Sequence, residues 1–231
     1  MNDVLVALTR ESGRNEPLRR WVDSRARVVE VPLTFTRYRS VDDVANDVRT
    51  SRHFGQFHAL VATSSRVEPY VDIAAESLIA GSMSYSVGAR TTAMLENHGL
   101  SVAYQSTGTS VEVAPRIEQG PVLILGAVNG RHELVDLLRS RHLESHFVRC
   151  YETRPVVLDE EAVGTLRNAN VVFIGAPSAW RVAREVIARD AWVLVPGRTT
   201  LNVVRSTHQR SLVGWGGDFE RAWRVVIDSD A

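Results

Sequence analysis

The sequence repeats part of itself, and this repeat limits the fold more than any other feature does. Residues 4–33 resemble residues 122–151, and residues 58–67 resemble residues 171–180. The chain therefore has the order X, Y, X, Y, where X has the pattern strand, helix, strand and Y is a longer run of strands and helices. We expect two similar domains rather than one large domain.

Short apolar runs alternate with segments of helical periodicity along the whole sequence. The runs at 3–8, 58–63 and 121–126 predict strands, because each holds apolar residues in a short stretch bounded by polar ones. The segments 41–50 and 66–78 predict helices, the first with Ser40 as its N-cap, and the segment 27–33 predicts a further strand. Strands that alternate with helices indicate an α/β fold with parallel sheets.

Each X unit ends in an extended segment that carries aromatic residues. These segments are LTFTRY at 33–38 and CYETRP at 150–155. Two such segments predict a two-stranded linker between the domains. The repeat itself leaves open whether each X pairs with the Y before it or with the Y after it.

The composition excludes several classes of function. The formal net charge is zero, so no overall field attracts the protein to nucleic acid or to an anionic membrane. All basic residues are Arg, which excludes Schiff-base and P-loop lysines. One Cys excludes an internal disulfide and a multi-Cys metal site. Without an export signal or a membrane-spanning apolar run, we expect a cytoplasmic protein.

Five loops that follow predicted strands are rich in hydroxyl groups and small residues, and most of them carry an Arg. In parallel sheets such loops line a crevice at which helix N-termini offer unpaired N–H groups to anions. The alternative is that each Ser or Thr only caps a helix. The residues that we predict to bind an anionic ligand in these loops are Thr9, Arg10, Thr63, Ser64, Ser65, Thr91, Ser178, Thr199 and Thr200.

Two of these loops share the tripeptide Arg-Thr-Thr, at 90–92 and at 198–200. Each tripeptide follows an apolar strand and a Gly and precedes a helical segment. We expect these loops to correspond in the two domains and to face one cleft.

Tyr151 is the candidate catalytic residue, because it begins the second linker segment and a phenol can donate a proton to a leaving oxygen. A structural aromatic residue at a domain boundary is the alternative. The neighbouring Cys150 is expected to be a packed thiol. His142 and His146 do not share one helical face, so no metal site is predicted.

Taken in order, these motifs resemble those of the uroporphyrinogen-III synthase family over nearly the whole chain. The resemblance rests on short segments whose order and spacing match the family. They are Thr9-Arg10, ALVATSSRV (59–67), SVGARTTAMLENHGLSV (86–102), GTSVEVAPRI (108–117), VLILG (122–126) with Gly130-Arg131, CYETRP (150–155), FIGAPSAWRV (173–182) and PGRTT (196–200).

The resemblance implies a pairing of the repeat units and a reaction. Domain one would hold residues 1–34 plus 153–231, and domain two residues 37–150, with linkers around 33–38 and 150–155. The enzyme would be a lyase that dehydrates and cyclises linear hydroxymethylbilane to uroporphyrinogen III, with inversion of the last pyrrole ring, in haem biosynthesis. No cofactor and no metal are implied.

The resemblance also implies site residues and partners. The linker tyrosine of the family falls on Tyr151, which would assist loss of the substrate hydroxyl. The carboxylate-rich substrate matches a cleft lined by hydroxyl, N–H and guanidinium groups. We expect a monomer that binds this small molecule and no nucleic acid or membrane, with channelling from hydroxymethylbilane synthase as a further partner interaction.

The sequence departs from the family pattern at three loop positions. Ala176 stands where the family has Ser, Gly126-Ala127 where it has an Arg, and Pro196 where it has an aliphatic residue. The alternative to the enzyme is therefore a non-catalytic or regulatory paralogue of the same fold that binds a carboxylate-rich ligand. An unrelated two-domain binder of the periplasmic type is a third hypothesis, and the expected lack of an export signal speaks against it.

Overall fold

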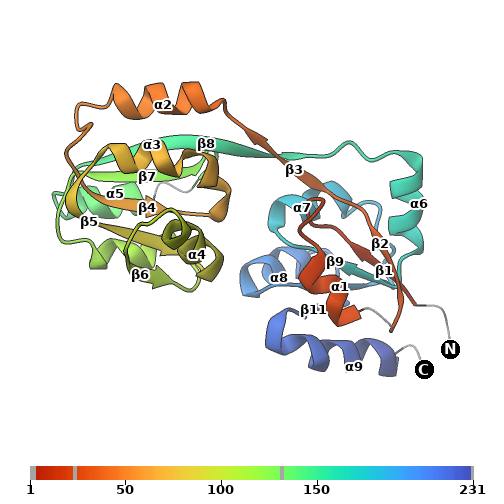
Figure 1. Cartoon of the computed structure of the whole chain (residues 1–231). Helices are drawn as coiled ribbons and strands as arrows, with labels where there is room; N and C mark the ends of the chain where they lie inside the picture. The colour runs from red at the N-terminus through yellow and green to blue at the C-terminus, as the bar shows by residue number, and fades with distance from the viewer. Residues whose placement is uncertain (1–3, 23–24, 131–132, 230–231) are drawn as a thin grey trace. The chain divides into compact units, whose positions relative to one another are not determined.

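The computed structural model describes residues 4–22, 25–130 and 133–229 (Figure 1). The chain divides into two compact units. Unit 1 contains Met1–Thr36 and Arg154–Ala231, and unit 2 contains Arg37–Thr153. Within the described ranges, no helix is long and apolar enough to span a membrane.

Unit 1 is built on a five-stranded sheet with the order β11-β10-β9-β1-β2. All four strand pairs are parallel, so the carboxyl ends of the strands lie at one edge of the sheet. The strands are β1 (Leu5–Leu8), β2 (Arg27–Glu30), β9 (Val171–Phe173), β10 (Trp192–Val195) and β11 (Ser211–Val213).

Alternate side chains of each strand point to opposite faces of this sheet, and helices pack against the apolar side chains of both faces. Val6 and Leu8 of β1 pack with α1 (Glu16–Val22) and α9 (Phe219–Ser229), the latter preceded by the 3-10 turn η3 (Gly216–Asp218). Ala7 of β1 points to the opposite face and belongs to the core there. The helices that contribute to this core are α6 (Glu160–Asn168), α7 (Pro177–Ala183) and α8 (Arg198–Arg205).

Unit 2 is built on a six-stranded sheet with the order β3-β8-β7-β4-β5-β6. The pairs from β8 to β6 are all parallel. The strands are β3 (Thr34–Tyr38), β4 (Phe57–Ala62), β5 (Leu78–Val87), β6 (Val102–Ser106), β7 (Val122–Ala127) and β8 (Ser145–Pro155).

The sheet of unit 2 is also covered on both faces. One core is shared with α2 (Val41–Arg49), η1 (Ser65–Tyr70), α3 (Val71–Glu76) and α4 (Ala89–Asn97). The opposite core is shared with η2 (Ser110–Arg116) and α5 (Glu133–Ser140). Ser40 caps α2 as expected, since its Oγ accepts the N–H of Asp43 at 3.1 Å.

The two sheets have equivalent topologies, which is the structural form of the sequence repeat. Strands β2-β1-β9-β10-β11 of unit 1 correspond to β8-β7-β4-β5-β6 of unit 2. The predicted α/β fold with parallel sheets is therefore confirmed. Unit 1 holds the first X and the last Y. Among the parallel strands of unit 2, β4 comes first along the chain, whereas the strand equivalent to β1 is β7.

Two antiparallel segments join the units. The N–H of Arg39 donates to the carbonyl of Cys150 at 3.0 Å, and the N–H of Val156 donates to the carbonyl of Leu33 at 3.0 Å. Because β8 is parallel to β7, it leaves unit 2 at the carboxyl edge of the sheet. The chain also leaves the unit 1 sheet at its carboxyl edge, after β2.

The boundaries of two predicted elements differ from the structure. The predicted helix at 66–78 is a 3-10 turn followed by the short α3, and β5 already begins at Leu78. Pro69 explains the 3-10 turn, because proline lacks the N–H that a continuous helix needs. The strand predicted at 27–33 ends at Glu30, two residues before Pro32.

Cys150 is fully buried in the core of unit 2, as expected for a packed thiol. Burial raises the pKa of this thiol to about 12. Since the thiolate is the reactive form, we expect Cys150 not to react with Ellman's reagent at pH 8 in the native protein and to react fully in urea. Rapid reaction of the native protein would contradict this burial.

Candidate functional site

Each sheet contains one point at which the strand order reverses. In unit 1 this switch point lies between β1 and β9, and in unit 2 it lies between β7 and β4. Ligands of open α/β sheets bind beyond the carboxyl ends of the strands at such a point. The predicted loops at 9–10, 63–66 and 176–178 follow strands on either side of these two points.

Thr9 and Thr63 tie the strands together at the two switch points. The Oγ1 of Thr9 donates to the carbonyl of Phe173, the last residue of β9. The Oγ1 of Thr63 donates at 3.0 Å to the carbonyl of Leu125 in β7. The same threonine contact thus occurs in both units, and each hydroxyl proton is used inside the protein rather than offered to a ligand.

Arg10 is held in a defined position in unit 1. The amide side chain of the buried Asn15 accepts the N–H of Arg10 at 3.2 Å and donates to its carbonyl at 3.1 Å. The guanidinium carbon lies 5.4 Å from the ring centroid of Trp215, a cation–π distance. A fixed guanidinium at this edge suits a carboxylate ligand.

The two Arg-Thr-Thr segments lie at equivalent helix starts, but one residue out of register. Gly88 is the N-cap of α4 and Gly197 is the N-cap of α8. The third helical residues are then Thr91 and Thr200, and both are buried. Unit 1 has an extra residue, Pro196, between its strand and its glycine. The two loops therefore correspond as helix starts, but the repeated tripeptide does not mark equivalent residues within them.

The remaining predicted residues differ in how accessible their hydroxyl groups are. Thr91 donates its hydroxyl to the carbonyl of Val87 at 2.7 Å, and Ser64 caps η1 by accepting the N–H of Arg66 at 3.3 Å. Thr199 and Ser178 are exposed near the starts of α8 and α7. Ser65 is half-buried. The N-cap alternative therefore holds for Ser64, whereas Thr199 and Ser178 are accessible to a ligand.

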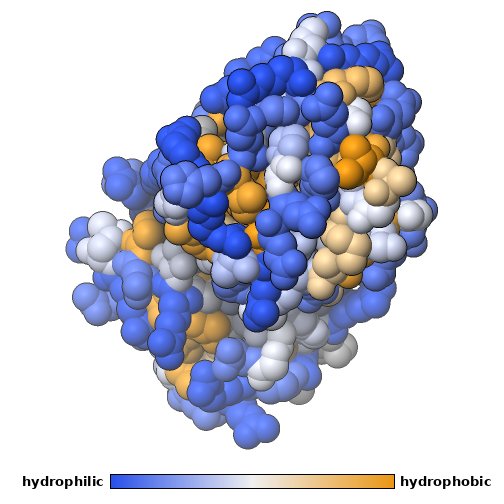
Figure 2. Space-filling model, turned by 90° about the vertical axis from the view of Figure 1, so that its left-hand side faces the viewer, coloured by the Kyte–Doolittle hydropathy of each residue, from blue (hydrophilic) through white to orange (hydrophobic). Residues whose placement is uncertain are grey.

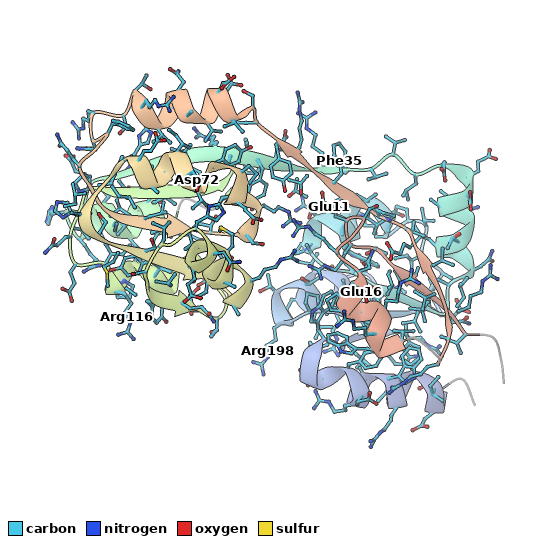
Figure 3. The ribbon with its side chains drawn as sticks, in the orientation of Figure 1. Glu11, Glu16, Phe35, Asp72, Arg116 and Arg198 are labelled. Carbon is cyan, nitrogen blue, oxygen red and sulfur yellow. The ribbon has the colours of Figure 1, made fainter. Side chains whose placement is uncertain are left out.

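The start of α8 carries an exposed cation as well. Figure 3 shows Arg198 projecting away from the ribbon at this helix start. Next to it stands the exposed Thr199. With the unpaired N–H groups of a helix N-terminus, this is an arrangement that favours an anion.

A β-bulge directs Tyr151 at the carboxyl edge of unit 2. Gly126 pairs with Arg149 and Ala127 pairs with Tyr151, so Cys150 is the extra residue. Bulges of this kind re-aim the side chain that follows them. The carbonyl of Tyr151 accepts the N–H of Val128 at 2.6 Å, which fixes its backbone.

Two side chains pack against the Tyr151 ring. The guanidinium carbon of Arg66 lies 5.8 Å from its centroid, and the ring of Tyr38 lies 6.4 Å from it. The predicted loop at 63–66 and the predicted Tyr151 are therefore neighbours in unit 2. Neither Arg66 nor Tyr38 is among the predicted site residues, since 85 and 113 residues separate them from Tyr151 in the chain and no local pattern reports the contact.

Gly126 has a packing reason that explains one departure from the family pattern. A Cβ at this position would lie 2.7 Å from Cζ of Phe147 and 3.0 Å from Oγ1 of Thr63. No side chain, and hence no Arg, fits there without displacing the ring. The departure follows from how β7 packs on β8 next to the Thr63 contact.

We predict that Gly126→Ala lowers the free energy of unfolding by about 1–3 kcal/mol, because the added methyl overpacks against Phe147. In a Phe147→Leu background the same change should cost less, because the ring edge is gone. Urea unfolding of the four proteins followed by circular dichroism measures this coupling. Equal costs in both backgrounds would contradict the contact.

Comparisons with known proteins agree with this fold. A family model described as uroporphyrinogen-III synthase HemD matches residues 22–213, most of the chain. No curated protein matches the sequence.

Several solved structures have the same fold. A mutant uroporphyrinogen III synthase from the extreme thermophile Thermus thermophilus is 17% identical, covers 98% of this chain and 99% of its own, and has a TM-score of 0.66. The uroporphyrinogen-III synthetase of Helicobacter pylori is 16% identical, with the same coverage and a TM-score of 0.66. The wild-type Thermus protein in another crystal form is 17% identical, covers 98% and 99%, and scores 0.51.

The family model and the sequence motifs are independent of the structure and agree with each other. The resemblance on which the expected fold and reaction rest is confirmed by the match over residues 22–213. The chain belongs to the uroporphyrinogen-III synthase family.

Proposed function

We propose that this protein is a functioning uroporphyrinogen-III synthase. It dehydrates and cyclises hydroxymethylbilane to uroporphyrinogen III and inverts the last pyrrole ring. The observation that carries the proposal, beside family membership, is Tyr151 at the carboxyl edge of unit 2 with the Arg66 guanidinium 5.8 Å from its ring. A phenol and a cation in contact suit the loss of a hydroxyl group from a polyanionic substrate.

Both carboxyl edges supply groups for the substrate's carboxylates. In unit 1 these are the guanidinium of Arg10 and the exposed α8 start with Arg198 and Thr199. In unit 2 they are Arg66 and Ser65 at the start of η1. Arg side chains and helix-start N–H groups both bind carboxylates well, the former in a bidentate fork.

Four hydroxyls that are buried or half-buried have a different role in this proposal. Thr9, Thr63 and Thr91 donate to backbone carbonyls and so hold strand ends and one helix start in place, and Thr200 is buried at the start of α8. The loops that touch the substrate are then fixed before it binds. Preorganised donors cost no rearrangement when charge develops in the reaction. This is how four of the predicted binding residues support the site.

The proposed chemistry begins with Tyr151. Its phenol donates a proton to the hydroxyl of the bilane, and water leaves. The remaining cation is an azafulvene, stabilised by the lone pair of the pyrrole nitrogen. Attack by the substituted end of the last ring gives a spiro intermediate, whose opening and reclosure invert that ring. The proton released when the ring regains aromaticity restores the phenol.

The protein's main contribution is then to control the geometry of the substrate. The azafulvene reacts without further activation, so the site must favour the inverted closure over the direct one. We propose that residues 1–34 plus 153–231 and residues 37–150 form two domains, each of which offers anion-binding loops at the carboxyl ends of its strands.

The proposed function also includes a compartment, an oligomeric state and a source of substrate. The buried free thiol of Cys150 suits a reducing compartment, which supports a cytoplasmic location. We propose that the protein acts as a monomer. The substrate closes spontaneously, so direct transfer from hydroxymethylbilane synthase would limit formation of the wrong isomer.

The alternative of a non-catalytic paralogue rests on the three loop departures. Gly126 is explained by packing against Phe147, and Pro196 is an added residue ahead of the α8 start. The third departure, Ala176, is the N-cap residue of α7. The structure gives no account of how this alanine would affect substrate binding.

Incubation with freshly generated hydroxymethylbilane tests the proposed function. After oxidation and separation of the isomers, we expect isomer III to form faster than the spontaneous isomer I. A reaction without protein and one with heat-denatured protein serve as controls. Isomer I alone, at the spontaneous rate, would refute the enzyme and leave the non-catalytic paralogue.

Tyr151→Phe tests the proton donor. Removing the phenol hydroxyl keeps the ring and its contacts, so we expect kcat to fall by about 10²- to 10⁴-fold, the usual range for loss of a general acid. Tyr104→Phe, which removes a phenol elsewhere in unit 2, is the matched control. Undiminished formation of isomer III by Tyr151→Phe would remove this residue from the mechanism.

Arg66 variants test whether the cation acts through Tyr151. Arg66→Gln should lower kcat by about 3- to 30-fold, the equivalent of a cation–π contact, and Arg66→Lys should retain part of the activity. In a Tyr151→Phe background Arg66→Gln should cost less. A rise in KM alone, equal in both backgrounds, would show that Arg66 binds substrate without positioning Tyr151.

A further inference from the structure

A second site lies at the opposite edge of the unit 2 sheet, where β5 is irregular. Phe57 of β4 pairs with Leu78, but Ala59 pairs with Met83, so β5 advances five residues while β4 advances two. The additional residues bulge away from the sheet. The pairing of β5 with β6 has a second register shift, between Ser84 and Tyr85 of β5.

The bulge is held in a defined conformation. Gly81 has a φ of 81°, in the left-handed region that favours glycine. The Oγ of Ser82 lies 2.8 Å from the carbonyl oxygen of Phe57 and 2.6 Å from that of Ile79. The residues of β5 between Leu78 and Met83 have no partner in the register with β4, and bulges are over-represented next to active sites.

The bulge borders a cavity of about 490 Å³ at the amino ends of the strands. This volume lies in the range of small-molecule sites. Tyr85 and Ala59 are buried and form an apolar floor, and Ile79, Met83 and Ala103 line the sides. Figure 2 faces the side from which these strands start, and hydrophobic residues (orange) are exposed there among hydrophilic ones (blue).

Two opposite charges stand among the cavity residues. The guanidinium carbon of Arg116 lies 5.1 Å from the ring centroid of Tyr104, which orients this cation. Figure 3 shows Arg116 at the surface of unit 2. Glu118 also lines the cavity. Burial raises the pKa of the Tyr85 phenol, and the negative charge of Glu118 raises it further.

These two charges do not neutralise each other. Within the part of the chain that the structure describes, neither Arg116 nor Glu118 takes part in an ion pair, although several other acidic and basic side chains of unit 2 do. The cavity therefore offers an apolar floor, one cation and one anion to a ligand. A ligand that matches all three must be apolar in its body and carry both charges.

We propose that this cavity binds a small zwitterion with an aromatic body, such as an aromatic amino acid or an aminoalkyl heteroaromatic acid. The ring lies over Tyr85 and Ala59, the carboxylate meets Arg116, and the ammonium group meets Glu118. The candidate catalytic loops follow the carboxyl ends of the same strands, so this site is separate from them within unit 2. The proposal does not depend on the proposed function.

Three related probes test the charge pattern in the ligand-free protein. L-tryptophan carries both charges, indole-3-propionate lacks the ammonium group, and tryptamine lacks the carboxylate. By saturation-transfer NMR or calorimetry we expect tryptophan to bind with a Kd on the order of 1 mM, as its size allows. Each analogue should bind about two- to fivefold more weakly, since exposed charge pairs contribute little each.

Variants assign the binding to the cavity. Ala103→Leu should fill its side and weaken all three probes by at least about tenfold, through lost volume. Arg116→Gln should weaken tryptophan and indole-3-propionate but not tryptamine, and Glu118→Gln should weaken tryptophan and tryptamine but not indole-3-propionate. Arg49→Gln, in an exposed ion pair with Glu76 elsewhere in unit 2, is the charge-matched control.

The outcomes are decisive and separate from enzymatic activity. Equal affinity for the three probes, or binding that Ala103→Leu leaves unchanged, would overturn the proposal. So would the absence of saturable tryptophan binding at concentrations about tenfold above the expected Kd. Thermal melts followed by circular dichroism check that each variant is folded. Failure of the bilane assay would leave these results unaffected.

Discussion

Parallel strand pairing across the two switch points is the constraint on which the rest of the structure depends. In unit 1 the Thr9 hydroxyl joins β1 to the end of β9, and in unit 2 the Thr63 hydroxyl joins the end of β4 to β7. Because every pair in the two sheets except that of the linker strand β3 is parallel, all the loops after the strands emerge at one edge of each sheet. In each unit, the candidate loops lie together because they all follow strand ends at that edge.

The same packing decides which side chains remain for chemistry. Phe147 occupies the space in front of Gly126, which excludes an Arg at this position. The bulge at Cys150 buries the thiol and directs Tyr151 toward Arg66. The cation of unit 2 thus comes from the loop after β4 rather than from the loop after β7. One departure from the family pattern is in this way a rearrangement of the site's surroundings, consistent with a functioning enzyme.

Much of the fold, and part of the site, could be predicted from local pattern. Short-range periodicity predicts strands such as 121–126 and helices such as 41–50, and Ser40 predicts the start of the helix at 41–50. The contacts of Arg66 and Tyr38 with Tyr151 could not be predicted, because they join distant segments. The repeated Arg-Thr-Thr marks corresponding helix starts, but Arg90 is the second residue of its helix and Arg198 the first, so the threonines differ by one helical position.

The sequence by itself determined the α/β class, the internal repeat, the family and the loops that carry polar groups, since each is written in residue type and spacing. Only the tertiary structure decided which polar groups are available. Thr91 and Thr200 are buried while Thr199 is exposed, although all three are threonines at a helix start. Burial depends on what packs against a residue, and those neighbours come from segments that no local pattern connects.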